Sequence, residues 1–173
     1  MVSLLAFTGL VVFVALQRLV EVAHSRRNEA RLRGRGAIEH VPWQVWMLTA
    51  VHSAWLVSTI AEVWWVRPPF RPEIGVPALL VFIAGQALRL AAIRTLGGRW
   101  TIRVMTLPDA GRVTHGLYSW LRHPNYVGVA LEIASLPLVH GGIVTAVVFS
   151  LVNALALALR IRVEHRALVE AEP

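Results

Sequence analysis

Apolar residues occur in five long runs along the chain, separated by stretches rich in arginine, proline or glycine. A membrane-spanning helix needs roughly 20 consecutive apolar residues, and four of the runs approach or exceed that length. The fourth run is shorter, so we expect it to be tilted or to begin below the membrane surface. The pattern predicts one all-α integral membrane domain over residues 1–173, with about five transmembrane helices. The expected spans cover about 2–23, 43–66, 74–96, 126–139 and 143–161.

The stretches between the runs predict how the helices connect. Three prolines within 67–72 cannot continue a helix, so a short stiff turn is expected there. Residues 140–142 are His-Gly-Gly, a link so short that the last two helices must form a tight antiparallel hairpin. The long loop 97–124 begins with alternating apolar and polar residues, and turn-forming residues follow at 108–111. That alternation predicts a short β-hairpin that caps the bundle.

Composition and charge support a membrane protein and indicate its orientation. The chain is 56% hydrophobic with a mean hydropathy of +0.59, which is unusually apolar for a soluble domain. Its net charge of +7 comes from arginines that lie at the ends of the apolar runs. This placement is typical of a topology signal, so we expect no nucleic acid as a partner. By the positive-inside rule, the loop 97–124 and the C-terminus face the cytoplasm and the N-terminus lies outside.

Charged residues inside an apolar run need a partner or access to water. Arg89 is in the third run and Glu132 is in the fourth. With a rise of about 1.5 Å per residue, each would lie roughly 7–10 Å below the cytoplasmic surface. Because a lone charge at that depth is costly, we expect the two side chains to approach each other inside the bundle. The alternative is that Arg89 reaches the interface while Glu132 alone lines a substrate entrance.

Polar residues concentrate in two clusters, where we expect the chemistry. The first lies within 116–128, where Tyr, Arg, His, Asn and a second Tyr accompany a proline. Pro124 lacks a backbone donor and disfavours a helical conformation at His123, so the chain must break there. The second cluster ends the last apolar run, where Arg160 and Glu164 are spaced to share one face of a helix. From spacing alone, an ordinary surface ion pair is the simpler explanation of that second cluster.

Together, the two clusters resemble the isoprenylcysteine carboxyl methyltransferase family. The resemblance rests on the run Gly116-x-Tyr118-x-x-x-Arg122-His123-Pro124-Asn125-Tyr126-x-Gly128, followed after a helical hairpin by Arg160-x-x-x-Glu164. It implies an integral membrane enzyme that uses S-adenosyl-L-methionine (SAM) as the methyl donor. It also implies that Arg160 anchors an anionic acceptor and that Glu164 contacts the cofactor, both as catalytic residues. The other cofactor contacts that it implies are Arg103, Ala110, Gly111, Arg112, Val113, Tyr118, His123, Pro124, Asn125 and Tyr126.

Two positions depart from the family pattern. Ala110 stands where eukaryotic relatives commonly have histidine, and His165 stands where many relatives have a second glutamate. The acceptor therefore stays open between a prenylated cysteine carboxylate and another lipophilic molecule with an acidic enol. A lysine-free chain rich in alanine, valine and arginine is typical of a bacterium with a GC-rich genome. We therefore expect a protein of the bacterial cytoplasmic membrane, with the lipid bilayer and a lipophilic acceptor as its partners.

Two other functions fit the same residues. A phospholipid N-methyltransferase would share the membrane setting, but its amine acceptor would gain nothing from Arg160. A non-enzymatic membrane scaffold would use both polar clusters only to fix helix packing. A metal site is not expected for any of these functions, because the chain has no cysteine and His24, His40 and His140 share no spacing.

Overall fold

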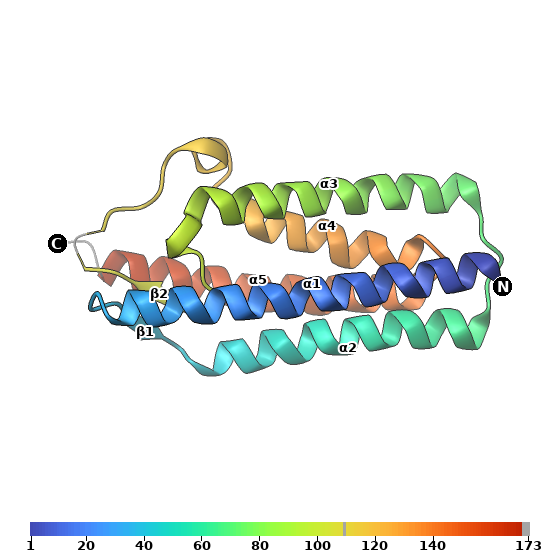
Figure 1. The fold of residues 1–173 in the computed structure, drawn as a ribbon, viewed down its shortest axis with the longest axis horizontal. Helices are drawn as coiled ribbons and strands as arrows, with labels where there is room; N and C mark the ends of the chain where they lie inside the picture. The colour runs from blue at the N-terminus through green and yellow to red at the C-terminus, as the bar shows by residue number, and fades with distance from the viewer. Residues whose placement is uncertain (109, 171–173) are drawn as a thin grey trace.

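The computed structural model describes residues 1–108 and 110–170 and shows an elongated helical bundle (Figure 1). The helices are α1 (Val2–Arg33), α2 (Trp43–Val66), α3 (Pro72–Leu96), α4 (Pro124–Leu138) and α5 (Ile143–Glu170). Two 3-10 helices, η1 (Gly97–Arg99) and η2 (Gly116–Ser119), and two short strands, β1 (Ile38–His40) and β2 (Val104–Thr106), belong to the loops at one end. The predicted all-α class is confirmed, with one small sheet added.

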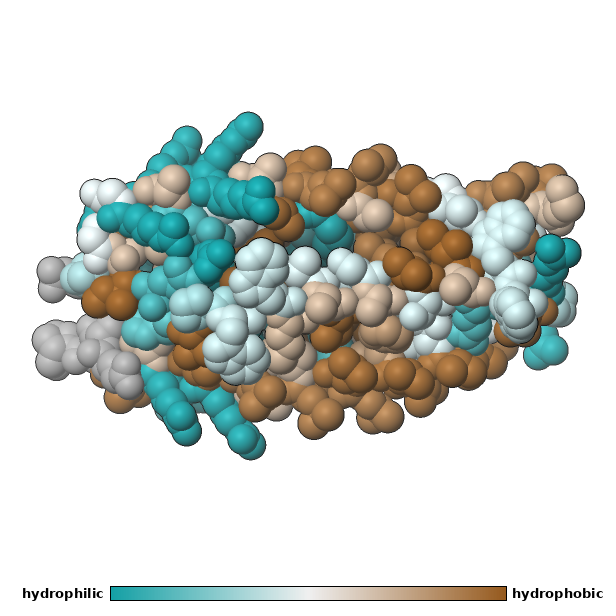
Figure 2. All heavy atoms as spheres, turned by 90° about the horizontal axis from the view of Figure 1, so that it is seen from below, coloured by the Kyte–Doolittle hydropathy of each residue, from teal (hydrophilic) through white to brown (hydrophobic). Residues whose placement is uncertain are grey.

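The surface of the bundle is apolar along its middle and polar toward both ends (Figure 2). Helices α1, α3 and α5 are long and apolar enough to cross a membrane, as expected of an integral membrane protein. Large apolar side chains on their outward faces include Leu5, Phe13, Leu80, Ile83, Val147 and Leu151. Helices α2 and α4 run alongside these three (Figure 1), and their crossing of the bilayer stays a prediction.

Helices α3 and α4 approach closely because glycines stand at their contact. A Cβ added at Gly128 of α4 would lie 2.8 Å from the carbonyl oxygen of Gly85 in α3 and 2.5 Å from the Cγ of Arg89. No side chain fits at such distances, so Gly128 sets how near α4 lies to α3. Because α4 begins at Pro124, this contact also fixes where the first turn of α4 sits.

The predicted antiparallel hairpin of α4 and α5 is confirmed (Figure 1). Gly141 in its short link has a φ of +78°, a left-handed conformation that favours glycine. The first turn of α5 is held by Glu62 of α2, whose carboxylate accepts hydrogen bonds from the backbone N–H groups of Val144 at 3.0 Å and Thr145 at 2.7 Å. A carboxylate at this position satisfies donors that have no partner within the helix.

The predicted β-hairpin within the loop 97–124 is wrong. Strand β2 does form where the alternation indicated, but it pairs antiparallel with β1, so that Ile38 lies opposite Thr106. The residues at 112–114 form no strand. Helix α1 also continues beyond the expected span to Arg33, because no glycine or proline interrupts the polar residues that follow its apolar part. The longer helix carries β1 to the end of the bundle where β2 lies.

Arg89 and Glu132 meet inside the bundle, as the sequence predicted. Nη1 of Arg89 lies 3.4 Å from Oε2 of Glu132, whose side chain is 0% exposed. Two charges of α1 join them. Arg18 bonds to Glu132 and lies 2.8 Å from Glu21, and Nη2 of Arg89 lies 2.5 Å from Glu21. We call Arg18, Glu21, Arg89 and Glu132 the buried charge cluster; its two positive and two negative formal charges cancel.

Glu132→Gln should destabilise the protein strongly, because it leaves two guanidinium groups around one carboxylate. Breaking a buried ion pair typically costs about 3–5 kcal/mol. The double variant Arg89→Met with Glu132→Leu removes one charge of each sign and retains the pair of Arg18 and Glu21, so it should lose less stability. Thermal unfolding in detergent measures both variants.

Glu73→Gln is the matched control for this comparison, because it makes the same change at an exposed glutamate of α3. It should lower the unfolding temperature only slightly, because it removes no more than the interaction of Glu73 with the N-terminus of α3, about 0.3–1 kcal/mol. A double variant that is less stable than Glu132→Gln would contradict a stabilising role for charge balance in the cluster.

Candidate active site

The candidate site begins at the turn that leads into α4. Gly116 opens η2 with a φ of +59°, and a Cβ added there would lie 3.1 Å from the Cγ2 of Thr95. His123 precedes α4 in a non-helical conformation, and Pro124 occupies the first position of the helix. This is the chain break that the His-Pro sequence predicts. Tyr126 follows in the first turn, and its ring stacks on that of His123 with centroids 5.3 Å apart.

Helix α5 brings the second polar cluster against this turn. The hydroxyl of Tyr126 donates a hydrogen bond to Oε2 of Glu164 at 2.7 Å, and Nε of Arg160 donates to the same hydroxyl at 3.1 Å. Nδ1 of His123 lies 3.7 Å from Oε2 of Glu164. Four residues that the sequence singled out therefore meet in space. The hydroxyl of Tyr126 lies between Arg160 and Glu164, so the two are more than a surface ion pair at a helix end.

Arg160 is held at two points of its guanidinium group. Its Nη2 donates to the carbonyl oxygen of Ile102, in the segment between η1 and β2, while its Nε bonds to Tyr126. The residue is 5% exposed. Within residues 1–108 and 110–170, no group bonds to its Nη1. A buried guanidinium with one unbonded amino group is suited to binding an anion.

Tyr118 and Asn125 add two polar groups with distinct properties. Burial raises the pKa of the Tyr118 phenol to about 12, and the negative charge of Glu164 adds to this shift. Tyr118 therefore stays protonated and can donate a hydrogen bond at neutral pH. Oδ1 of Asn125 is buried and has no hydrogen-bond partner among the residues that the structure describes. Because such an oxygen costs about 1–3 kcal/mol when unbonded, it is a candidate acceptor for a ligand donor.

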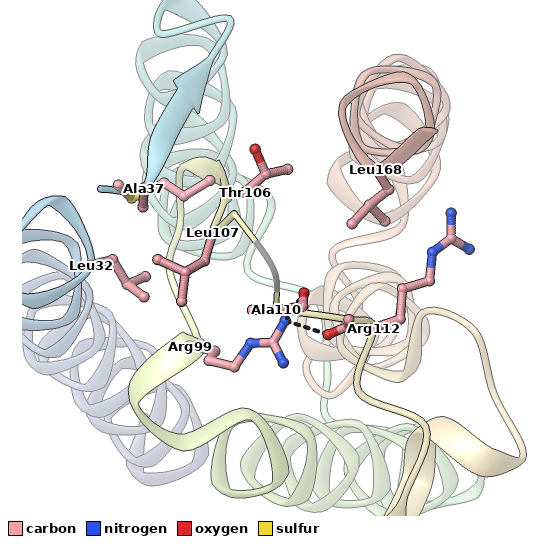
Figure 3. A pocket seen from close by; sticks show the side chains of 10 residues that line it. Leu32, Ala37, Arg99, Thr106, Leu107, Ala110, Arg112 and Leu168 are labelled. Carbon is pink, nitrogen blue, oxygen red and sulfur yellow. Dashed lines mark hydrogen bonds between the residues drawn. The ribbon is translucent and has the colours of Figure 1, made fainter. Parts of the chain in front are cut away.

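A small cavity near the end of α5 contains three more of the predicted residues (Figure 3). Ala110, Gly111 and Arg112 line it together with residues of α1, β2 and α5, and its volume is about 80 Å³. Nη2 of Arg99 donates to the carbonyl oxygens of Ala110 and Gly111 at 3.3 Å and 2.8 Å. Val113 is half-buried and follows these residues directly, but it does not line the cavity.

Arg103 is engaged elsewhere by two glutamates. Its Nε lies 3.0 Å from Glu29, and its Nη1 bonds to Glu39. Burial opposes ionisation of Glu39, but hydrogen bonds from Arg103 and Arg33 outweigh burial and hold the pKa of the Glu39 carboxyl below its usual 4.5. The bond to Glu39 in turn raises the pKa of Arg103. The structure does not bring Arg103 to Tyr126, and its contact with a cofactor stays a prediction.

Three residues of α1 that reach this end of the molecule were not predicted. Ser25, Asn28 and Glu29 are buried and bind the segment from η1 to β2. A signal for Ser25 and Glu29 was present, because polar residues recur at positions 17, 21, 25 and 29. That spacing places them along one face of a helix. Because we expected the first span to end near residue 23, positions 25 and 29 were not recognised as part of the same helix.

Apolar helices long enough to cross a membrane, with a polar cluster at their arginine-rich end, are the features of an integral membrane protein. The sequence model of the isoprenylcysteine carboxyl methyltransferase family matches residues 78–170. The chain belongs to this family. The matched part contains Arg160, Glu164 and the whole run 116–128.

Individual relatives match the chain over different lengths. The uncharacterised protein YpbQ of Bacillus subtilis is 36% identical over 169 residues, which are 95% of this chain and 97% of that protein. Human protein-S-isoprenylcysteine O-methyltransferase is 35% identical over 81 residues, which are 46% of this chain and 28% of the human protein. The solved structure of the eukaryotic intramembrane Ras methyltransferase superposes with a TM-score of 0.55 at 26% identity, over 77% of this chain and 47% of that one. The chain thus spans about half or less of these named methyltransferases.

The ionisation of Tyr118 can be measured directly, because the chain contains two tyrosines. In the Tyr126→Phe variant, the phenolate absorbance should appear with a midpoint at about 12 instead of 10.0. Adding Glu164→Gln should lower the midpoint, since a nearby negative charge opposes phenolate formation. Burial, the larger cause, should still hold the midpoint above 10.0.

Glu73→Gln in the same Tyr126→Phe background is the control and should leave the midpoint in place. Circular dichroism at each pH shows whether the helices persist. A midpoint near 10.0 in a protein with intact helices would contradict the burial of Tyr118 beside Glu164.

Proposed function

We propose that this chain is a SAM-dependent O-methyltransferase that acts on a lipophilic acceptor with an anionic oxygen, either a carboxylate or an enol. The observation that carries the proposal is the meeting of Arg160, Tyr126 and Glu164 at the arginine-rich end of an apolar bundle. The family and the human relative support methyl transfer to oxygen by their names. The isoprenylcysteine in those names belongs to the relatives, and for this chain it defines one candidate acceptor.

The residues at the site fit SAM, which carries a sulfonium cation, an ammonium group, hydroxyls and a purine. The carboxylate of Glu164 can accept hydrogen bonds from the hydroxyls and attract the cationic groups. Oδ1 of Asn125 has no donor among the described residues, so it can accept a hydrogen bond from the cofactor. The stacked rings of His123 and Tyr126 offer an aromatic surface. The proposed cofactor contacts are His123, Pro124, Asn125, Tyr126, Tyr118 and Glu164, with Ala110, Gly111, Arg112 and Val113 from the loop before them.

The cavity beside Ala110 would hold only part of the cofactor in this conformation. Its volume is about 80 Å³. Typical ligand pockets are larger, at roughly 300–1,000 Å³. The remainder of the cofactor would therefore lie toward His123 and Tyr126, where the unbonded Asn125 oxygen and the Glu164 carboxylate are found.

The protein itself has a limited chemical task in this reaction. When bound, SAM supplies an electrophilic methyl group on sulfur. Arg160 can orient the acceptor's anionic oxygen and offset its loss of hydration, because hydrogen bonds from guanidinium to an anion are strong and directional. The acceptor is already ionised near neutral pH, so its oxygen needs no general base. Positioning of the two reactants then supplies the main rate effect.

The two other functions account for the site less well. A neutral amine of a phospholipid would gain nothing from the buried guanidinium of Arg160. A scaffold that only fixed helix packing would leave the buried Oδ1 of Asn125 without a partner among the described residues. A ligand bound beside the first turn of α4 would supply a donor to this oxygen and an anion to Nη1 of Arg160.

We further propose that the site faces the cytoplasm of a bacterial cell. Long hydrophilic side chains project from the end of the bundle that carries the loops (Figure 2), whereas the turn at the opposite end contributes Arg67 and Arg71. The positive-inside rule places the richer end in the cytoplasm, where SAM is available. A lipophilic acceptor would reach the site sideways from the bilayer.

Substitutions should separate acceptor binding from cofactor binding. Arg160→Ala should lower methyl transfer by about 100-fold, because it removes a charged hydrogen bond worth up to about 3 kcal/mol, while SAM affinity stays within a few-fold. Tyr126→Ala should weaken SAM binding directly. Equilibrium binding of SAM to detergent-purified protein and methyl transfer to an S-prenylated cysteine with a free carboxylate measure the two effects.

Arg162→Ala is the matched control, because Arg162 is an exposed arginine on the same helix. Both measurements should match the unmodified protein. Equal loss of SAM affinity in Arg160→Ala and Tyr126→Ala would show that the roles are divided wrongly. No SAM binding by the unmodified protein at millimolar concentration would reject the proposed function in favour of the scaffold.

Reporter fusions test the orientation. A reporter joined after Pro173 should lie in the cytoplasm, and one inserted at Gly141 should lie on the other side of the membrane. A cytoplasmic enzyme and a periplasmic enzyme fused at both positions give complementary signals. The same side for both positions would refute the proposed topology.

A further inference from the structure

The part of α1 beyond its apolar stretch carries three buried polar side chains that serve the loop behind the site. Ser25 and Asn28 are each 1% exposed, and Glu29 is buried as well. Buried polar groups cost free energy unless they are hydrogen-bonded. Nδ2 of Asn28 donates to the carbonyl oxygens of Gly97 at 3.1 Å and Trp100 at 2.8 Å. This helix face therefore holds the backbone of the segment that joins η1 to β2.

Ser25 makes the contact nearest to the site. Its Oγ accepts a hydrogen bond from the backbone N–H of Ile102 at 2.8 Å and donates to Oε1 of Glu29 at 2.6 Å. The hydroxyl thus uses its one donor and accepts a bond as well. Oε2 of the same glutamate binds Arg103 at 3.0 Å, so the backbone on the far side of Ile102 is also tied to α1.

The candidate site holds Ile102 from the opposite direction. The carbonyl oxygen of Ile102 accepts a hydrogen bond from Nη2 of Arg160, whose Nε bonds to Tyr126. The backbone of one residue therefore links Ser25 of α1 to Arg160 of α5. Because a guanidinium group is planar, two fixed bonds also fix the direction of its third nitrogen, Nη1. That nitrogen is the one proposed to meet the acceptor.

We propose that Ser25 is a positioning residue for Arg160, acting through the backbone of Ile102, and that it thereby sets where the acceptor's anionic oxygen binds. The inference rests on the proposed function of Arg160. It concerns a helix outside residues 78–170, the part of the chain that the family model matches. A serine that only packed α1 against its neighbours would not need a hydroxyl bonded to the residue that Arg160 contacts.

The first test needs no acceptor. The Nε–Hε resonance of Arg160, identified by its loss in Arg160→Lys, reports the hydrogen bonding of the guanidinium group in the detergent-solubilised full chain. Ser25→Ala should shift this resonance, and Ser25→Thr, which keeps the hydroxyl, should restore it. Ser135→Ala is the matched control and should leave it in place. Ser135 is also buried, but its hydroxyl bonds to the Leu131 carbonyl of its own helix at 2.6 Å.

The second test uses methyl transfer to an S-prenylated cysteine with a free carboxylate. Ser25→Ala should lower kcat/KM for this acceptor by about tenfold, the effect of losing one hydrogen bond of ordinary strength. SAM affinity should stay within about twofold, because Ser25 acts on Arg160 and not on the cofactor residues. In an Arg160→Lys background, Ser25→Ala should add less than about twofold, since the two changes remove the same link.

The two tests separate this inference from the proposed function. A shifted Arg160 resonance in a protein that binds no SAM at millimolar concentration would support the link and reject the proposed function. Equal methyl transfer by Ser25→Ala and Ser135→Ala, or an unshifted resonance in Ser25→Ala, would overturn the inference and leave the proposed function standing. If Ser25→Ala does not fold, Ser25→Cys takes its place in both tests, because it keeps the volume and accepts hydrogen bonds poorly.

Discussion

Charged and polar side chains between apolar helices have no bulk water around them, so each must find its partner within the protein. This constraint acts at two depths of the bundle. In its interior, the buried charge cluster joins α1 to α3 and α4. At the polar end, Tyr126 joins α4 to α5, and Ile102 joins α5 back to α1. Apolar attraction has no direction of its own. The polar bonds therefore fix the register of the helices together with close contacts such as that at Gly128.

Much of the fold could be predicted from the sequence, because proline and glycine mark the ends of the apolar runs. Pro72 and Pro124 begin α3 and α4, as their fixed φ and missing donor require. The meeting of Arg89 and Glu132 followed from their depth in the membrane. Arg18 lies at a similar depth in the first span, but the sequence alone does not show which face of α1 turns toward α3 and α4. The pairing of β2 with β1 could not be predicted either, since a strand of three residues does not specify which other segment it pairs with.

The sequence predicted which residues form the candidate site, but not which of them bond to one another. The motif indicated His123, Tyr126, Arg160 and Glu164, and the structure brings these four together. Their spacing could not reveal that the Tyr126 hydroxyl lies between the arginine and the glutamate, because that depends on how α4 and α5 are rotated. Ala110 and Gly111 lie at a separate small cavity, so residues that a family motif groups together occupy two neighbouring regions of this molecule.

The bond between Ser25 and Ile102 joins residues 77 positions apart, and the contact of His40 with Thr106 joins residues 66 apart. A ribosome makes the chain from its N-terminus, so α1 enters the membrane long before these partners exist. During that interval, water and lipid headgroups at the membrane surface must solvate its polar face. Arg160 and Glu164 are made later still, after all the partners named above. The order of synthesis therefore lets the frame of the site form before α5 packs against it and completes the site.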